Sequence, residues 1–234
     1  MKTIATLSLL LSLLQPIHAQ GIIEKDSMAL LDLYHQTNGS LWVRPWNLDE
    51  SIAYWTGVEV ADGRVIAITM PQNDLQGSLP ASIGNLDALE RLQLSSNRLN
   101  GNLPDEIRGL GSLRYLDLGN NTLSGTLPNG MSALAELEFL FLTANQFNGE
   151  IPSELSQLRK LKVLSMGSNQ FHGQLPPEFG QMAELTNLDL DNNQLIGTIP
   201  DSYMQLKKLR FLNLGNNQIE ASTLARWNTL LLRK

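Results

Sequence analysis

The hydrophobic positions of this chain repeat with a period of 24 residues from Val65 to Asn217. Each copy opens with Leu-x-x-Leu-x-Leu, as in Leu113, Leu116 and Leu118, and the last part of this phrase alternates apolar and variable residues. Alternation with a period of two is typical of a half-buried β-strand. Because the period is unbroken, the unit to count is the repeat, and the sequence predicts one solenoid with one strand per repeat.

One asparagine recurs at the same place in every copy, where the chain leaves the strand. Its amide offers two donors and an acceptor to backbone groups that would otherwise be buried without partners. We therefore expect these asparagines to form a ladder of hydrogen bonds between coils. The seven positions, spaced by 24 residues without insertion or deletion, are Asn73, Asn97, Asn121, Asn145, Asn169, Asn193 and Asn217.

The second half of each copy follows a Leu-x-Gly-x-Leu-Pro pattern, as in Leu99, Gly101, Leu103 and Pro104. Glycine permits a backbone conformation closed to other residues, and proline stops strand pairing because it lacks an N–H. The remainder buries a residue every three or four positions, which predicts a loose helical or 3₁₀ wall on the convex side. Strands of successive repeats then pair in parallel, with equivalent variable residues in columns about 4.8 Å apart.

The full pattern, Leu-x-x-Leu-x-Leu-x-x-Asn-x-Leu-x-Gly-x-Ile-Pro, resembles the plant-type leucine-rich repeat of receptor-kinase ectodomains, polygalacturonase inhibitors and many exported microbial proteins. The resemblance implies an α/β repeat fold, a horseshoe-shaped solenoid with one parallel concave sheet. It also implies that the Gly-Pro half often forms a second small sheet, and that the concave face binds the partner. Ala53 and Val60 stand where the family's cap carries a cysteine pair, so an apolar pair is expected to replace the crosslink and the chain looks closest to Cys-free exported microbial members.

The N-terminal residues 1–19 are typical of a secretory signal peptide, with an apolar segment Ile4–Leu14 and a small residue, Ala19, at the cleavage point. The apolar segment is shorter than the ~20 residues that span a bilayer. We expect a secreted, periplasmic or cell-surface protein without stable membrane insertion after the signal is removed.

Two caps are predicted around the solenoid, which covers residues 65–218 in about seven repeats. Residues 20–64 form the N-terminal cap, with a short amphipathic helix behind a capping Asp26 or Ser27 and a hairpin turn at Asp62-Gly63. The cap also holds three tryptophans, which we interpret as a cover for the apolar end of the first repeat and not as a ligand site. Residues 219–234 lack the Gly and Pro of the repeat and predict a closing C-terminal helix.

Composition removes several classes of function. The chain has no cysteine, which excludes disulfides, thiolate metal sites and cysteine nucleophiles, and its net charge of −6 argues against nucleic acid or an anionic membrane as partner. His35 and His172 lie far apart in the sequence, and no catalytic or phosphate-binding motif accompanies either of them. We predict that the protein is not an enzyme and needs no cofactor or metal.

The variable positions of the sheet columns carry the candidate site. Tyr115, Phe139 and Phe141 should touch, and exposed rings on adjacent strands are typical anchors of an interface, although they could merely stack on one another. Asp189 and Asp191 project from one strand and could receive a Lys or Arg of a partner, or weakly a Ca²⁺, or be solvated surface charges. The predicted partner-binding residues are Arg91, Tyr115, Asp117, Phe139, Phe141, Thr143, Asp189, Asp191 and Phe211.

These features predict an exported leucine-rich-repeat binding module that recognises a protein or peptide through its concave face. The resemblance to polygalacturonase inhibitors leaves a second alternative, an inhibitor of a secreted polysaccharide-degrading enzyme. An ice- or surface-binding role is the third and weakest alternative, because the columns mix Arg, Phe, Asp and Gly without a rank of threonines.

Overall fold

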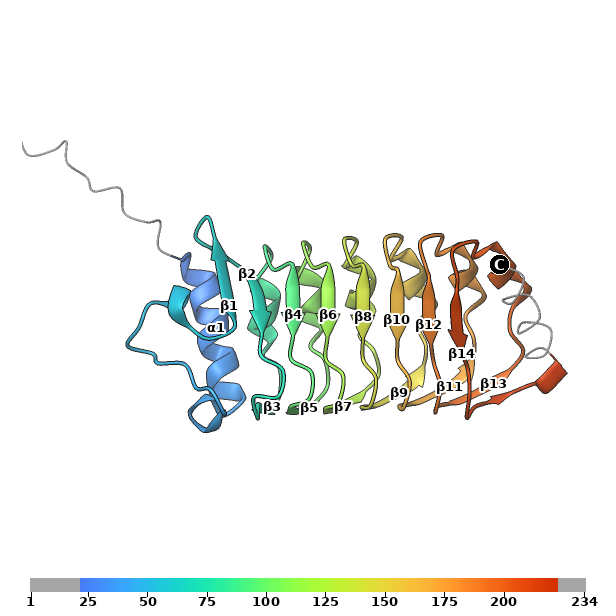
Figure 1. The fold of residues 1–234 in the computed structure, drawn as a ribbon, viewed down its shortest axis with the longest axis horizontal. Coiled ribbons are helices and arrows are strands. Elements are labelled where there is room, and N and C mark those ends of the chain that lie inside the picture. Colours follow the sequence, from blue (N-terminus) through green and yellow to red (C-terminus); the bar gives the residue numbers. More distant parts are fainter. Residues whose placement is uncertain (1–21, 223–234) are drawn as a thin grey trace, which may run out of the picture.

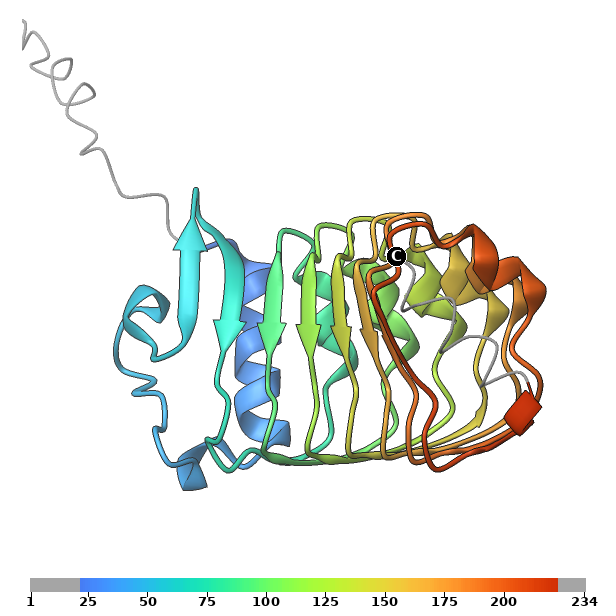
Figure 2. The ribbon, with the colours of Figure 1, turned by 45° about the vertical axis from the view of Figure 1, so that its right-hand side comes forward.

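Two sheets run side by side along the solenoid in the computed structural model, which describes residues 22–222 (Figure 1). The larger sheet has eight strands in the order β1-β2-β4-β6-β8-β10-β12-β14, and the second has seven in the order β15-β13-β11-β9-β7-β5-β3. Short 3₁₀ helices lie behind the larger sheet, as Figure 2 shows from a second direction. The predicted α/β solenoid is confirmed.

The larger sheet is parallel except for its first pair of strands. Its strands are β1 (Val58–Ala61), β2 (Arg64–Thr69), β4 (Arg91–Gln93), β6 (Tyr115–Asp117), β8 (Phe139–Phe141), β10 (Val163–Ser165), β12 (Asn187–Asp189) and β14 (Phe211–Asn213). From β4 onward, each strand residue pairs with the residue 24 positions later on the next strand. Equivalent variable residues therefore lie side by side. β1 and β2 pair antiparallel through Asp62 and Gly63, both at positive φ, which is the predicted hairpin.

The Gly-Pro halves of the repeats form the second sheet and the 3₁₀ wall. The sheet contains β3 (Gln76–Gly77), β5 (Arg98–Gly101), β7 (Thr122–Gly125), β9 (Gln146–Glu150), β11 (Gln170–Gln174), β13 (Gln194–Gly197) and β15 (Gln218–Ile219). The 3₁₀ helices are η3 (Ala81–Asn85), η4 (Asp105–Gly109), η5 (Asn129–Ala133), η6 (Ser153–Gln157), η7 (Pro177–Gln181) and η8 (Asp201–Gln205). Each follows a proline, which cannot extend the strand and whose fixed φ suits the start of a helical turn.

The repeated leucines fill the space between the sheets and the 3₁₀ wall and are almost all completely buried. The asparagines close the turn beside this core. Asn145 Oδ1 accepts a hydrogen bond from the Leu123 amide at 3.0 Å, and its Nδ2 donates to the carbonyls of Leu118 at 3.0 Å and Leu142 at 3.1 Å. Each side chain therefore joins its own coil to the preceding one. The same contacts recur at Asn121, Asn169, Asn193 and Asn217.

The helix α1 (Glu24–Gln36) covers the first coil, and it begins before the residues expected to cap it. No side chain caps its N-terminus, so the capping role predicted for Asp26 or Ser27 is wrong. The Asp26 carboxylate is completely buried and instead accepts hydrogen bonds from Arg64 Nε at 3.1 Å and the Val65 amide at 2.9 Å. A buried carboxylate needs such partners, and here they fasten the helix to β2.

The tryptophans of the cap pack on one another instead of facing solvent. The rings of Trp46 and Trp55 stack with centroids 4.6 Å apart, and Trp42 meets Trp46 edge-on at 4.8 Å. All three rings are buried, and each indole N–H donates to a backbone carbonyl. Ala53 is exposed, so a buried apolar pair with Val60 does not replace the family's crosslink. The short helices η1 (Gly39–Leu41) and η2 (Ile52–Tyr54) complete the cap.

The predicted signal peptide over residues 1–19 lies outside the described residues, as does most of the predicted closing helix over 219–234. Across the described part of the chain, no helix combines the length and the apolar character needed to cross a bilayer.

Replacing Asn145 with alanine should lower the free energy of unfolding by about 2–3 kcal/mol, because one buried amide and two carbonyls lose their partner together. Chemical denaturation of the variant against wild type measures this. The exposed neighbour Gln146→Ala is the matched control and should change stability by less than about 0.5 kcal/mol. Equal stability of Asn145→Ala and wild type would contradict the ladder.

Candidate binding face

The exposed side of the larger sheet is the concave face of the predicted horseshoe, and its strands present three columns of variable residues. Within β8, Leu140 is buried while Phe139 and Phe141 lie on the opposite, partly exposed side. The alternation follows from the two-residue period of a strand. These outward positions are free of the constraints of the core, and they contain every residue that the sequence singled out for partner binding.

Three rings meet in the middle of this face, as predicted. The centroid of Tyr115 lies 6.0 Å from that of Phe139 and 5.6 Å from that of Phe141. We call these three residues the aromatic cluster. Arg91 places its guanidinium 4.7 Å above the Tyr115 ring, and Lys162 Nζ lies 5.9 Å from the Phe139 ring, so cations flank the cluster on both sides. Burial raises the pKa of the Tyr115 hydroxyl, and the nearby Asp117 adds to the rise.

The structure does not bring Phe211 to the aromatic cluster. Phe211 lies on β14, separated from β8 by β10 and β12, and it is 45% exposed. Thr143, next to the cluster in sequence, makes a 2.8 Å hydrogen bond to the Ser165 hydroxyl. The predicted site is therefore one compact aromatic group with Thr143 beside it and a separate ring near the end of the sheet.

Asp189 and Asp191 form an acidic pair on and just after β12. Burial raises the pKa of Asp189, with the Asp191 carboxylate a smaller cause. Asp191 accepts a hydrogen bond from the side-chain amide of Asn192 at 2.7 Å, and Asp117, on β6 and three repeats before Asp189, accepts one from the Gly119 backbone amide at 3.1 Å. No group of three or more His, Asp or Glu side chains arranged to hold a metal ion occurs among residues 22–222.

A row of charged residues directly before the strands escaped the sequence analysis. It contains Glu90, Arg114, Glu138 and Lys162, spaced by 24 residues, and we call it the charged row. Arg114 Nε donates to Glu138 at 2.9 Å, and Lys162 pairs with the same carboxylate from the other side. These hydrogen bonds, from Lys162 first and then Arg114, lower the pKa of Glu138 to about 2. The signal was present in the repeat spacing, one position before each first variable residue.

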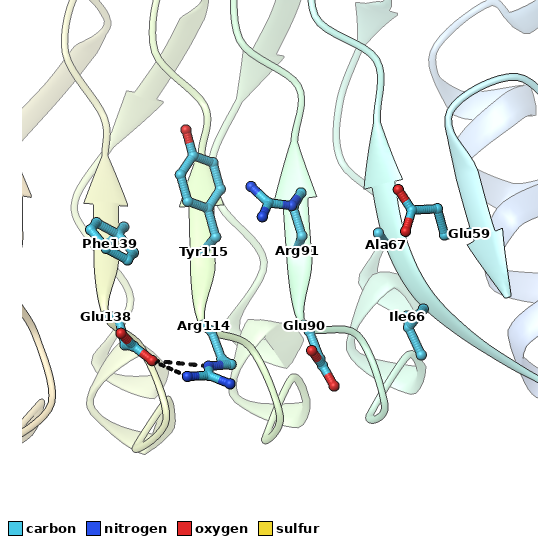
Figure 3. A pocket seen from close by; sticks show the side chains of 9 residues that line it. All are labelled: Glu59, Ile66, Ala67, Glu90, Arg91, Arg114, Tyr115, Glu138 and Phe139. Atoms are coloured by element: carbon cyan, nitrogen blue, oxygen red, sulfur yellow. Dashed lines mark hydrogen bonds and ion pairs between the residues drawn. The ribbon is translucent and has the colours of Figure 1, made fainter. Parts of the chain in front are cut away.

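An open depression of about 350 Å³ lies between the aromatic cluster and the N-terminal cap (Figure 3). Arg91 and Tyr115 border it on the sheet, the Arg114–Glu138 pair lies along its rim, and Glu59 stands on the far side. The small Ala67 leaves the floor between Glu59 and Arg91 uncovered. Sequence reasoning missed Glu59 and Ala67 because they belong to the hairpin and the first repeat, where the strand pattern is irregular.

Two family models match the chain. The first, described as a leucine-rich repeat region, matches residues 71–172, and the second, described as a leucine rich repeat, matches residues 159–219. Together they span more than half of the chain. The protein belongs to the leucine-rich-repeat family, with repeats of the plant type.

Several solved structures share the fold. A TDR receptor is 40% identical over 64% of this chain and 26% of its own length, with a TM-score of 0.64. A plant ice-binding protein is 28% identical over 86% of this chain and 73% of its own, with a TM-score of 0.76. The ectodomain of the Arabidopsis receptor kinase HAESA, in complex with an IDA peptide hormone that is lengthened at its N-terminus, is 26% identical over 83% of this chain and 33% of its own, with a TM-score of 0.74. The chain thus spans only a quarter to a third of the two receptors.

Replacing Glu138 with glutamine should lower the free energy of unfolding at pH 7 by about 1 kcal/mol, because both partner cations are partly exposed. The pKa of Glu138 is about 2 in the folded protein against an ordinary 4.5, so its contribution is present above pH 4.5 and lost as the pH falls toward 2. Denaturation at several pH values should therefore show the free energies of unfolding of wild type and Glu138→Gln converging as the pH falls from 4.5 toward 2. The exposed Glu106→Gln is the control, and a gap that persists at low pH would contradict the assignment.

Proposed function

We propose that this protein is an exported leucine-rich-repeat module that binds a protein or peptide through its concave face. The observation that carries the proposal is the aromatic cluster, three contacting rings on an exposed sheet face that the fold itself does not require. Rings held partly in water are costly unless a partner covers them, and such rings dominate the energetics of known interfaces. The HAESA structure, solved with a peptide hormone, supports a peptide or protein as the class of partner.

Export of the protein, and its likeness to Cys-free exported microbial members of the family, are also part of this proposal. They rest on the signal-like residues 1–19 and on a cap that holds together without cysteine, through the ring contacts of three tryptophans and the ion pair of the buried Asp26 with Arg64. Reducing conditions outside or inside a cell would leave such a cap intact. We further propose that the protein binds without catalysis, since His35 and His172 are both exposed on elements away from the aromatic cluster.

Truncating Phe139 and Phe141 together to alanine should abolish partner capture, because anchor rings contribute roughly 2 kcal/mol or more each. Affinity capture from the medium in which the protein occurs, with bound proteins and peptides identified by mass spectrometry, measures the loss. The matched control is Leu41→Ala with Val43→Ala, which removes two apolar side chains that are 71% and 67% exposed on the cap. A folded Phe139/Phe141 double variant that captures the same partners as wild type would refute the proposal.

Ice binding is a second candidate, favoured by one specific observation. The second sheet presents outward side chains that are regular and mostly uncharged, including the exposed Gln146, Gln170, Gln194 and Gln218 on four successive strands. A regular array of hydrogen-bonding groups suits a regular surface of water or hydroxyl groups. The similarity to a plant ice-binding protein over most of both chains supports this candidate.

If the second sheet binds ice, Gln170→Lys with Gln194→Lys should abolish inhibition of ice recrystallisation, because long charged side chains disrupt the regular array. Microscopy of frozen protein solutions in sucrose provides the measurement. Gln205→Lys, an exposed position on η8, adds a charge elsewhere and should leave the activity unchanged. Wild-type protein without any effect on ice grain size rules this candidate out.

A further inference from the structure

The charges at the outward positions from β4 to β14 are separated along the solenoid axis. The Glu59 carboxylate lies beyond them on β1, in register with Ala67 and Arg91. Among the outward positions of β4 to β14 and the turns after them, Arg91 is the one basic residue, and it lies at the N-terminal end. Asp189 and Asp191 lie at the other end, with the aromatic cluster between the two. Asp117 is the exception in the middle, where its carboxylate accepts the Gly119 amide.

Neither charged end is neutralised within the described part of the chain. Arg91 stacks on Tyr115 and makes no ion pair there, and neither Asp189 nor Asp191 pairs with a Lys or Arg. The charged row beside them behaves differently, because Arg114, Glu138 and Lys162 satisfy one another. Figure 3 shows Glu90 directed toward the rim, away from the Arg91 guanidinium. Arg91, Asp189 and Asp191 thus face the open side of the sheet without an ion pair in the described part of the chain.

Small residues keep the acidic end open. Ser165 and Gly167 precede the acidic pair by one coil, and Asn213 and Gly215 follow it. A Cβ on Gly167 would lie 2.1 Å from Asp191 Oδ1, so any larger residue would displace that carboxylate. Glycine at this position therefore leaves the space that the Asp191 carboxylate occupies.

The separation of the two ends sets the length of the ligand. Four strand-to-strand steps lead from β4 through β6, β8 and β10 to β12, and at about 4.8 Å per step they cover roughly 19 Å. An extended peptide advances about 3.3 Å per residue, so about six residues span this distance. The aromatic cluster lies one or two steps from Arg91 and two or three steps from the acidic pair.

Resting on the concave-face function above, we propose that the ligand is an extended peptide segment of about six residues with a fixed order of charges. A carboxylate of the peptide lies at Arg91, an apolar side chain covers the aromatic cluster, and a lysine or arginine lies between Asp189 and Asp191. The peptide crosses the strands along the solenoid axis. Charge complementarity at both ends selects this ligand against peptides of uniform charge.

Selection from a random 12-residue peptide library displayed on phage tests the order of charges. Wild-type protein should enrich peptides with an acidic and a basic residue about five or six positions apart and an apolar residue between them. The variant with Asp189→Lys and Asp191→Lys should instead enrich peptides that are acidic at both ends. Enrichment without this pattern, or no enrichment at all, overturns the inference.

The contribution of each charged end is then measured by fluorescence anisotropy, as the affinity of a synthetic peptide from the wild-type selection for the protein and its variants. Asp189→Asn with Asp191→Asn should weaken binding about tenfold, as should Arg91→Gln, whereas Asp105→Asn on η4 should have no effect. Selected peptides that depend on Phe139 and Phe141 but not on these charges overturn the charge order and leave the proposed function standing. Peptides that depend on neither set of residues overturn both.

Discussion

The hydrogen bonds of the repeated asparagine are the constraint on which the rest of this solenoid depends. Each interior copy satisfies an amide of the preceding coil with Oδ1 and carbonyls of two coils with Nδ2 at a turn where water is excluded. One extra residue between two asparagines would break this pairing, which explains why the spacing never departs from 24. Even the first copy obeys the rule, because Asn73 accepts the Arg44 amide and so ties the cap to the stack.

A fixed coil has a second consequence, since it fixes the position of every residue that the coil does not need. Strands β6 and β8 pair in register, so Tyr115 and Phe139 are neighbours although 24 positions separate them in the sequence. Binding chemistry can then change column by column without disturbing the leucines beneath. Gly167 marks the limit of that freedom, because the Asp191 carboxylate occupies the space that its side chain would fill.

The repeat made most of the fold predictable from sequence, and its edges were the least predictable parts. The sheet, the hairpin at Asp62-Gly63 and the contacts of Tyr115 with Phe139 and Phe141 follow from period and register alone. The capping role predicted for Asp26 was wrong because a helix-capping aspartate and a buried, ion-paired aspartate cannot be told apart in the sequence. The ion pair of Asp26 depends on Arg64, which is 38 positions away. The charged row could not be recognised from one repeat alone, because Arg114 and Lys162 meet Glu138 only across coils, 24 positions away.

The two halves of each repeat present different side chains to solvent. The two sheets therefore suit different kinds of ligand. The larger sheet carries rings and unpaired charges that vary from coil to coil, which suits one ligand in one register. The second sheet carries glutamine at the same exposed place in four successive coils, which suits a ligand that is itself regular. Because the aromatic cluster and these glutamines occupy different sheets, a substitution on one face leaves the other intact, and the two proposed binding functions can be tested separately in one protein.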